Sequence, residues 1–308
     1  MSLALPPPVS FLQAAQVAAT VIFLSVAAVG YVEIVYRILR FQYHKGVLKR
    51  YYPLPSNREL YSNFRNAVAF ISPPVLLYYF YMNPTVEQGP LWRIPTRPMS
   101  YRFNPLEMLV YLIGYMLMHD TLFYFMHTHA HYDKWMYKHT HAMHHEYTHE
   151  MNVFTTAYAE AMENAYQTGI PWTIYTAVSC HNFWLLFVPL SLNLTTTILG
   201  HSGFQAHPVF GYLNPALYVA QKLFGRHMLT PSDHAAHHSQ RRCNFGLFFR
   251  WQDKLHGTYV KAHIPCYTVE HWMKLLKDGQ YHQRGKAAAI DGAHQVVELN
   301  FEELHWGF

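Results

Sequence analysis

Apolar residues are concentrated in a few long runs, and polar segments rich in histidine separate these runs. The first run, residues 11–31, has the roughly 20 apolar residues that a helix needs to cross a bilayer. A second candidate, residues 68–81, is interrupted by two prolines, and a third covers residues 108–126. Residues 165–200 hold two further runs, broken near residues 179–182, whose length predicts a helical hairpin in the membrane. The pattern predicts an all-α, multi-span membrane helical bundle of about four to five membrane segments.

Basic residues follow the first apolar run directly. They are Arg37, Arg40, Lys45, Lys49 and Arg50. Such a cluster beside a membrane segment indicates the cytoplasmic side, whereas a nucleic-acid surface is disfavoured because no other basic face with interleaved aromatic residues occurs. With this orientation the second segment leads away, the third returns, and the hairpin goes out and back. All histidine-rich segments should then meet on the cytoplasmic face as a helical cap.

The composition agrees with a membrane protein. Hydrophobic residues make up 51% of the chain and charged residues only 13%, whereas a soluble domain usually has about 25% charged residues. The net charge is a modest +5. The three cysteines have no paired spacing, so neither a disulfide framework nor a Cys-x-x-Cys site is expected. Because basic residues follow the first run rather than precede it, we expect an anchor and not a cleaved signal peptide.

Histidine is the most informative residue type, and nine of the 23 histidines fall between His119 and His149. Three clusters have spacings of three and four residues, and one more histidine lies between the second and third clusters. Residues three or four apart share one face of a helix, so each cluster can present its imidazoles to a common point. The predicted metal ligands are His127, His131, His141, His144, His145, His201, His234, His237 and His238.

Nine imidazoles are too many for a single ion. A structural zinc site has four ligands and usually includes cysteine, whereas imidazole suits zinc, copper, iron and nickel. We therefore predict two metal ions that share a helical cage. Carboxylates should accept hydrogen bonds from the histidine N–H groups and offset the charge of the metals. The candidates are Asp120, which lies in an apolar run, Glu146 and Asp233, with Glu160 and Glu163 as further acids near the start of the hairpin.

Other histidines are left without a role. His119, His129, His139 and His149 fall out of phase with the neighbouring clusters or outside them, and no assignment is made for His207. A lone histidine beside a metal cluster is more often a supporting or surface residue than a ligand.

These residues, in this order and spacing, resemble the fatty acid hydroxylase and sterol desaturase superfamily of integral-membrane di-iron oxygenases over residues 120–259. The opening motif of the family is matched by Asp120, Tyr124, His127 and His131. The second box is matched by Tyr137, Lys138, His141, His144, His145 and Glu146, and the segment after it by residues 151–157 with Glu163. A sterol-oxidising branch has a motif similar to His201-Ser202-Gly203-Phe204. The third box is matched by residues 230–238, then 244–246 and 251–259.

The chain departs from the family pattern at three places. Thr128 stands where the first box usually has Arg, Glu160-Ala161 replaces a common His-Pro pair, and Gln252 is inserted between Trp251 and Asp253. Because the metal ligands are all present, these changes bear on the substrate more than on metal binding. They also leave open a degenerate member that keeps the fold without activity.

The resemblance implies an enzyme in which two iron ions activate dioxygen to hydroxylate or desaturate a lipid C–H bond. Sterols are slightly favoured over fatty-acyl, sphingoid or ether lipids, and zinc is the alternative metal in purified protein. A separate electron donor, a cytochrome b5-like protein or a reductase, would be needed. The endoplasmic reticulum is the expected membrane, with the mitochondrial membrane left open. The expected parts are N-terminal membrane anchor segments (1–105), the catalytic domain (106–260) and a cytoplasmic tail (261–308).

Two readings from other classes remain. The first is a structural subunit of a membrane complex that retains an old enzyme fold. The second is a zinc-handling membrane protein, which is disfavoured because no polar pathway of carboxylates runs through several membrane segments.

Overall fold

The computed structural model describes residues 11–54, 68, 100–148, 151–179, 182–262 and 264–278. Within these ranges the chain is mostly helical, with isolated β-bridges in place of strands, so the predicted all-α class is confirmed. The α-helices are α1 (Phe11–His44), α4 (Pro105–Tyr132), α5 (Lys134–Met136), α6 (Ala161–Glu163), α7 (Ile170–Val178), α8 (Phe183–His201), α9 (Pro215–Phe224), α10 (Pro231–Gln240), α11 (Trp251–Leu255) and α12 (Val269–Lys277). Short π- and 3-10 helices are η2 (Tyr137–His141), η3 (His144–Glu146), η4 (Thr155–Ala157), η5 (Asn164–Gly169), η6 (Pro208–Leu213) and η7 (Gly225–His227).

Three of the described helices, α1, α4 and α8, are long and apolar enough to cross a membrane. The expected hairpin is interrupted between α7 and α8, as predicted, but α7 has only nine residues and is not among these three. The expected segment at residues 68–81 lies, apart from Val68, outside the described residues. The described part of the chain thus contains three candidate spans.

Helix α1 continues well beyond the apolar run that predicted it and ends at His44. Its last turns are polar on one side, where Arg37 Nε donates to Glu33 Oε1 four residues earlier at 2.7 Å. On the other side Tyr36, Leu39 and Tyr43 are buried in the core. Helix α1 therefore continues beyond its apolar, membrane-spanning part, because one face of the extension still packs against the protein.

Helix α4 is also longer than predicted, and the extension carries the first histidine cluster. It begins after Asn104, whose side chain accepts hydrogen bonds from the N–H groups of Leu106 and Glu107 at 3.1 and 3.2 Å. Such a cap satisfies helix N–H groups that have no partner within the helix. The helix ends at Tyr132, so His127 and His131 lie in its last two turns.

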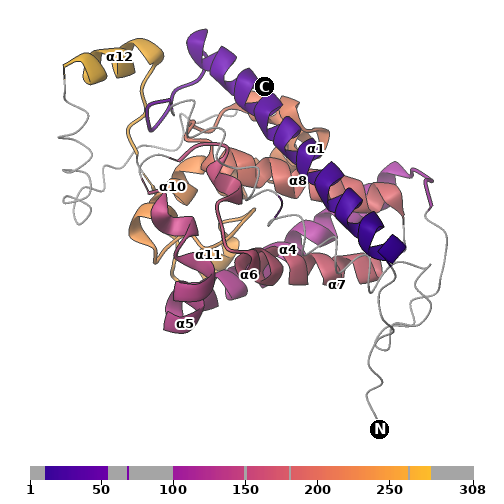
Figure 1. The fold of residues 1–308 in the computed structure, drawn as a ribbon. Helices are drawn as coiled ribbons and strands as arrows, with labels where there is room; N and C mark the ends of the chain where they lie inside the picture. The colour runs from indigo at the N-terminus through magenta and orange to yellow at the C-terminus, as the bar shows by residue number, and fades with distance from the viewer. Residues whose placement is uncertain are drawn as a thin grey trace.

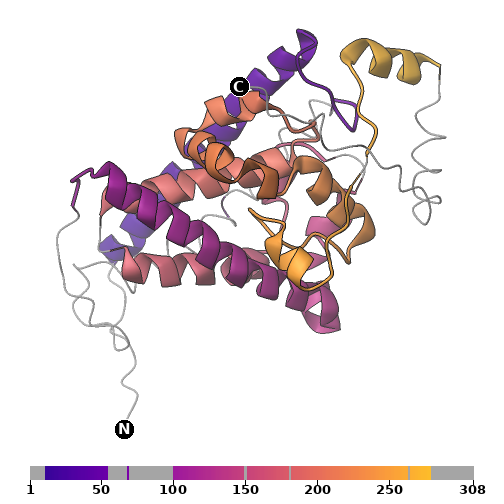
Figure 2. The same ribbon diagram turned by 180° about the vertical axis from the view of Figure 1, so that it is seen from behind.

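The helices converge at one end of the bundle. A β-bridge joins Ser100 to Asn182, so α4 and α8 begin side by side and both run toward the opposite end. There α5, α6, α10 and α11 gather, at the left of Figure 1. Figure 2 shows the same grouping from behind. Helix α1 crosses α8, with the Tyr31 hydroxyl 2.7 Å from the Thr195 hydroxyl.

The basic segment after α1 lies at this same end, as the charge pattern predicted. Arg50 forms isolated bridges with Phe204 and Tyr267. Its guanidinium donates to the Ser202 carbonyl at 3.0 Å and lies over the Phe204 ring at 4.3 Å. These contacts of Arg50 join the segment that follows α1 to the loop that follows His201.

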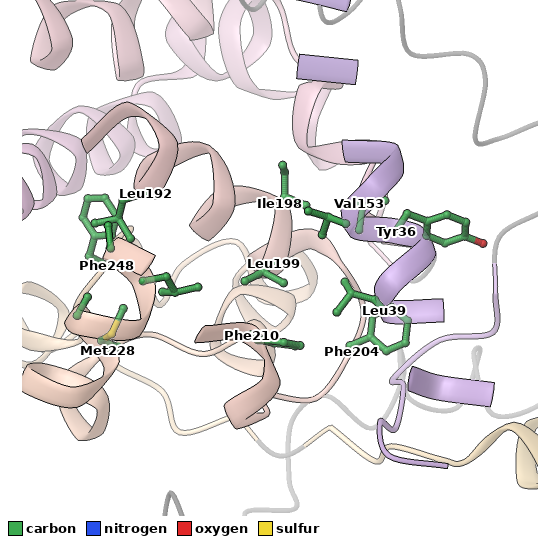
Figure 3. Close-up of a cluster of buried hydrophobic side chains, with 14 of the residues drawn as sticks. Tyr36, Leu39, Val153, Leu192, Ile198, Leu199, Phe204, Phe210, Met228 and Phe248 are labelled. Atoms are coloured by element: carbon green, nitrogen blue, oxygen red, sulfur yellow. The ribbon is translucent and has the colours of Figure 1, made fainter. Parts of the chain in front are cut away.

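A hydrophobic core fills the space between α1, α8 and the segments after them, as Figure 3 shows. Ten of its residues are Tyr36, Leu39, Val153, Leu192, Ile198, Leu199, Phe204, Phe210, Met228 and Phe248. This core holds the C-terminal half of α8, and with it His201, in a fixed position relative to the other helices.

Replacement of Gly203 with alanine is expected to destabilise the fold. Its φ of +71° favours glycine, and a Cβ there would lie 2.8 Å from the Met151 carbonyl oxygen and 3.0 Å from Arg50 Nη2. Gly203→Ala should therefore cost about 2–4 kcal/mol of stability. Gly46→Ala is the control, because Gly46 has a φ of +75° but nothing within 4 Å of the added Cβ. It should cost only about 1–2 kcal/mol. Unfolding in detergent measures both, and equal losses would contradict the steric argument.

Candidate metal centre

The structure brings the nine predicted histidine ligands together in two groups. The five-histidine group consists of His127, His131, His141, His145 and His237. The four-histidine group consists of His144, His201, His234 and His238. In each group one ring nitrogen per histidine lies within 4.8 Å of all the others. The side chains come from α4, the η2–η3 segment, α8 and α10, which are far apart in the sequence.

In the five-histidine group the Nε2 atoms point at one another. His141 Nε2 lies 2.9 Å from His127 Nε2 and 3.0 Å from His145 Nε2. His131 Nε2 lies 3.2 Å from both His145 Nε2 and His237 Nε2. Metal–imidazole bonds of about 2.1 Å separate neighbouring ligand nitrogens by roughly 3.0–3.4 Å. The observed separations match that geometry.

The four-histidine group has the same arrangement. His201 Nε2 lies 3.1 Å from His144 Nε2 and 3.0 Å from His234 Nε2. His238 Nε2 lies 3.1 Å from His234 Nε2. The donor set of nine imidazoles without a thiolate fits two borderline metal ions such as iron or zinc.

The sequence clusters and the spatial groups do not coincide. Pairs four residues apart, such as His234 and His238 on α10, share a group, but His237 joins the other one. On a helix, positions three and four residues further on lie about 100° apart around the axis, so they face different ways. His144 likewise leaves His141 and His145. The expectation that each cluster points to one common site is therefore wrong, because two of the clusters serve both groups.

Hydrogen bonds at Nδ1 fix the tautomer of most of these histidines. The acceptors for the Nδ1–H groups of His127, His144, His201, His237 and His238 are backbone carbonyls, at 2.8–3.1 Å. A carbonyl can only accept, so the proton is on Nδ1 and the Nε2 lone pair is free for a metal. Burial also lowers the pKa of His144 to about 4 and that of His238 well below its ordinary value. These imidazoles are therefore neutral, as metal ligands must be.

Glu163 is the acid that contacts a histidine of the groups. His141 Nδ1 donates to Glu163 Oε1 at 2.8 Å, and both side chains are buried. Burial, with a smaller contribution from Glu160, raises the pKa of Glu163 above its usual range, whereas a metal ion bound by His141 would favour the ionised carboxylate. A carboxylate in this position orients the imidazole and offsets the charge of a metal. Glu163 was one of several acids that the sequence offered, and its place after the second histidine box was the signal.

Asp120 acts on the backbone beside the centre. Its Oδ1 accepts the N–H groups of Leu247, Phe248 and Phe249 at 2.6–3.2 Å, and its Oδ2 accepts the Trp251 indole N–H at 2.7 Å. These bonds anchor the loop that also contains Phe245, whose carbonyl accepts the His127 Nδ1 proton. Asp253 holds the same loop through the N–H groups of residues 245 and 246.

The other two candidate acids also have partners other than histidine. Asp233 accepts from Arg250 at 2.8 Å and from the N–H of Thr230 at 2.9 Å, in a capping box that starts α10. Glu146 accepts from the Tyr158 hydroxyl at 2.7 Å. Among the described residues, the direct histidine contacts expected of Asp120, Glu146 and Asp233 are thus not formed. Their carboxylates instead accept hydrogen bonds from backbone N–H groups and from the side chains of Trp251, Arg250 and Tyr158.

The histidines left without a role lie outside both groups. His119 is buried, and its Nε2 accepts from the Asn193 amide at 3.0 Å. His129 and His139 are exposed, and His207 Nδ1 accepts from the Val209 N–H at the start of η6. His149 lies outside the described residues.

A cavity reaches both histidine groups. His127 and His141 of the five-histidine group line it, together with His144, His201 and His234 of the four-histidine group. Most of its remaining wall is apolar, and the wall includes segments from α8 to α10. An apolar cavity with a few convergent polar groups is the usual form of a ligand site.

Glu163→Gln should weaken metal retention by about 10- to 100-fold, because the acceptor that orients His141 loses its charge. Glu160→Gln is the control, since Glu160 lies three residues earlier and is exposed. Metal content during dialysis against a graded series of chelator concentrations measures the effect. Equal retention by the two variants would contradict the assigned role of Glu163.

Comparison with known proteins agrees with this arrangement. Residues 112–258 match the fatty acid hydroxylase family. Methylsterol monooxygenase 1 from Rattus norvegicus and its counterpart from Danio rerio are each 30% identical to the chain over 151 residues, 49% of this chain and 47% of each relative. The chain therefore spans about half the length of the curated relatives it matches. No solved structure matches it.

The resemblance seen in the sequence is thereby confirmed. The family match over residues 112–258, a little under half of the chain, and the two relatives support the fatty acid hydroxylase and sterol desaturase superfamily.

Proposed function

We propose that this chain is a membrane-bound di-iron oxidoreductase that uses dioxygen to hydroxylate or desaturate a C–H bond of a lipid. The observation that carries the proposal is the pair of histidine groups that line one largely apolar cavity at the end of three membrane-length helices. The match to the fatty acid hydroxylase family supports the same chemistry.

Iron is the proposed metal in both groups, and zinc is the alternative in purified protein. Bound iron would supply the redox chemistry that activates dioxygen. The protein would hold the metals through nine Nε2 atoms, and the Nδ1 hydrogen bonds would keep the rings in place. The apolar wall would exclude water and position the lipid against the centre.

A sterol is the favoured substrate. The two relatives reported above are named methylsterol monooxygenases, and the motif His201-Ser202-Gly203-Phe204 resembles that branch. Fatty-acyl, sphingoid and ether lipids are the alternatives, because the third histidine box, which begins with Thr230-Pro231, points to a different branch of the superfamily.

The membrane placement follows from the charge pattern. The basic segment that ends at Arg50 lies at the histidine end of the bundle, so the proposed metal centre faces the cytoplasm. We propose the endoplasmic reticulum as the membrane. Electrons would come from a separate cytochrome b5-like protein or reductase on the cytoplasmic side.

A structural subunit without activity is the second candidate, and the departures from the family pattern bear on it. Thr128 Oγ1 donates to carbonyls of its own helix, and Glu160 is exposed. Gln252 donates to the Thr121 hydroxyl at 3.1 Å. None of the three is among the histidine groups or in contact with them through these bonds. Retention of all nine histidines therefore favours the enzyme.

The test is oxygen-dependent turnover by the purified full chain with NADPH, cytochrome b5 and its reductase. A panel of sterols, fatty-acyl lipids, sphingoid bases and ether lipids should include one that gains a hydroxyl group or a double bond. Omission of oxygen should abolish the product. An iron-loaded, folded chain that oxidises none of these lipids, and that copurifies in fixed ratio with a membrane assembly, would favour the structural subunit.

A further inference from the structure

Three buried polar atoms without a protein partner lie around the cavity. They are Glu163 Oε2, Asn164 Nδ2 and Thr196 Oγ1, as judged within the described part of the chain. All three residues line the cavity that reaches both histidine groups. A buried polar atom without a hydrogen bond is costly, and a native structure contains few of them. Their concentration around one cavity therefore points to a ligand that supplies the missing bonds.

The surrounding structure fixes the positions of these three residues. Glu163 is fixed because its other oxygen accepts from His141 at 2.8 Å. Asn164 begins the π-helical segment η5, a geometry that is often found at functional sites. Thr196 lies on α8, one turn before Gly200 and His201. The three atoms come from two separate parts of the chain, so no single local turn explains why they are left without a partner.

The neighbouring residue Thr197 provides a comparison, because its hydroxyl group has hydrogen-bond partners. It lines the same cavity, but its Oγ1 donates to the carbonyls of Asn193 and Leu194 at 3.0 Å. A threonine on a helix can usually bond its own backbone in this way. Thr196 does not, although it stands on the same helix.

The chemistry of the three atoms is specific. The Asn164 amide N–H can only donate, Glu163 Oε2 accepts in the ionised form that a metal ion on His141 would favour, and the Thr196 hydroxyl can do both. A hydroxyl group, like a water molecule, can accept from the first and donate to the second. An ether, an ester or a bare hydrocarbon cannot donate, so it would leave an acceptor unpaired in a buried site.

We infer that Glu163, Asn164 and Thr196 form a subsite that binds a hydroxyl group of the lipid substrate. The inference rests on the proposed function and narrows the substrate class to lipids that have a free hydroxyl group. That group would bind inside the cavity. The hydroxyl belongs either to a sterol or to a long-chain alcohol such as a sphingoid base. The subsite orients the lipid, and its effect is on binding and position.

The test compares matched lipids by equilibrium binding to the full chain in detergent. One pair is cholesterol and its methyl ether, and the other is octadecanol and its methyl ether, all radiolabelled. The wild-type chain should bind the alcohol of one pair at least about tenfold more tightly than the ether. The pair with the tighter alcohol identifies the source of the hydroxyl.

Two variants assign the preference to the subsite. Thr196→Val removes the hydroxyl with little change in volume, and Asn164→Leu removes the amide donor. Each should reduce the preference for the alcohol about three- to tenfold. Thr197→Val is the matched control, and it should keep the preference because its hydroxyl bonds only the helix backbone in the structure.

Equal binding of alcohol and ether by the wild type, or an undiminished preference in both variants, would overturn the inference. This result is distinguishable from failure of the proposed function because binding needs no electron donor. Turnover of a lipid without a hydroxyl group would retain the oxygenase and remove the subsite. A hydroxyl preference without any turnover would retain the subsite and remove the oxygenase.

Discussion

Replacement of both His237 and His238 with alanine is expected to abolish oxygen-dependent lipid turnover. The two residues are adjacent on α10 but belong to different groups, so the double variant removes one ligand from each proposed metal site. Both side chains are also buried, and their Nδ1 atoms donate to carbonyls. Because an imidazole held in this way is a fixed ligand, its loss should exceed the 10- to 100-fold effect typical of a supporting residue.

The measurement for this variant is metal content together with lipid turnover. Both sites should lose metal, and turnover should fall at least about 100-fold. The matched control is the double variant His129→Ala/His139→Ala, because both histidines are exposed and outside the two groups. Loss of metal by the control, or retention of metal and turnover by His237→Ala/His238→Ala, would contradict the assignment.

Asp120→Ala is expected to cause the largest loss of stability of any single substitution considered. Its carboxylate accepts three backbone N–H groups and one indole N–H, and the residue is buried. Removal leaves four donors without an acceptor, two of them buried and two partly buried, which should cost about 3–5 kcal/mol. The loop that carries the Phe245 carbonyl would also lose its anchor, so His127 should hold metal less well.

The control for Asp120 is Asp133→Ala. Asp133 Oδ1 also accepts a backbone N–H, that of Met136 at 2.7 Å, but at an exposed helix start. Loss of such a cap should cost only about 1 kcal/mol. Thermal unfolding in detergent measures both variants. A loss for Asp120→Ala no larger than that for Asp133→Ala would show that the buried hydrogen bonds are not what stabilises the loop.

Residue spacing predicted which histidines come together but not how they divide into two groups. His127 and His131 lie within the regular α-helix α4, where residues four apart share one face. The segment from His141 to His145 instead passes from a π-helix to a 3-10 helix, which the local sequence does not reveal. Which group each histidine joins depends on how α10 packs against that segment, and that is a tertiary property.

The acids illustrate the same limit. The sequence indicates partners for Asp120 because a carboxylate in an apolar helix needs hydrogen-bond donors, and the structure supplies four of them. Those donors lie more than 120 residues away in the sequence, so only the fold shows that they are backbone groups and not histidines. Glu163 is harder to single out by spacing alone, because Glu160 lies only three residues earlier, and only the resemblance to the family segment after the second histidine box separates the two.

The most direct test of the account is the iron content of the gently purified full chain, measured per polypeptide by elemental mass spectrometry after reconstitution with ferrous iron. The account predicts about two iron ions per chain, one for each histidine group. A chain that is folded and retains all nine histidines but binds no iron, or binds only one ion at saturation, would contradict the proposed di-iron centre.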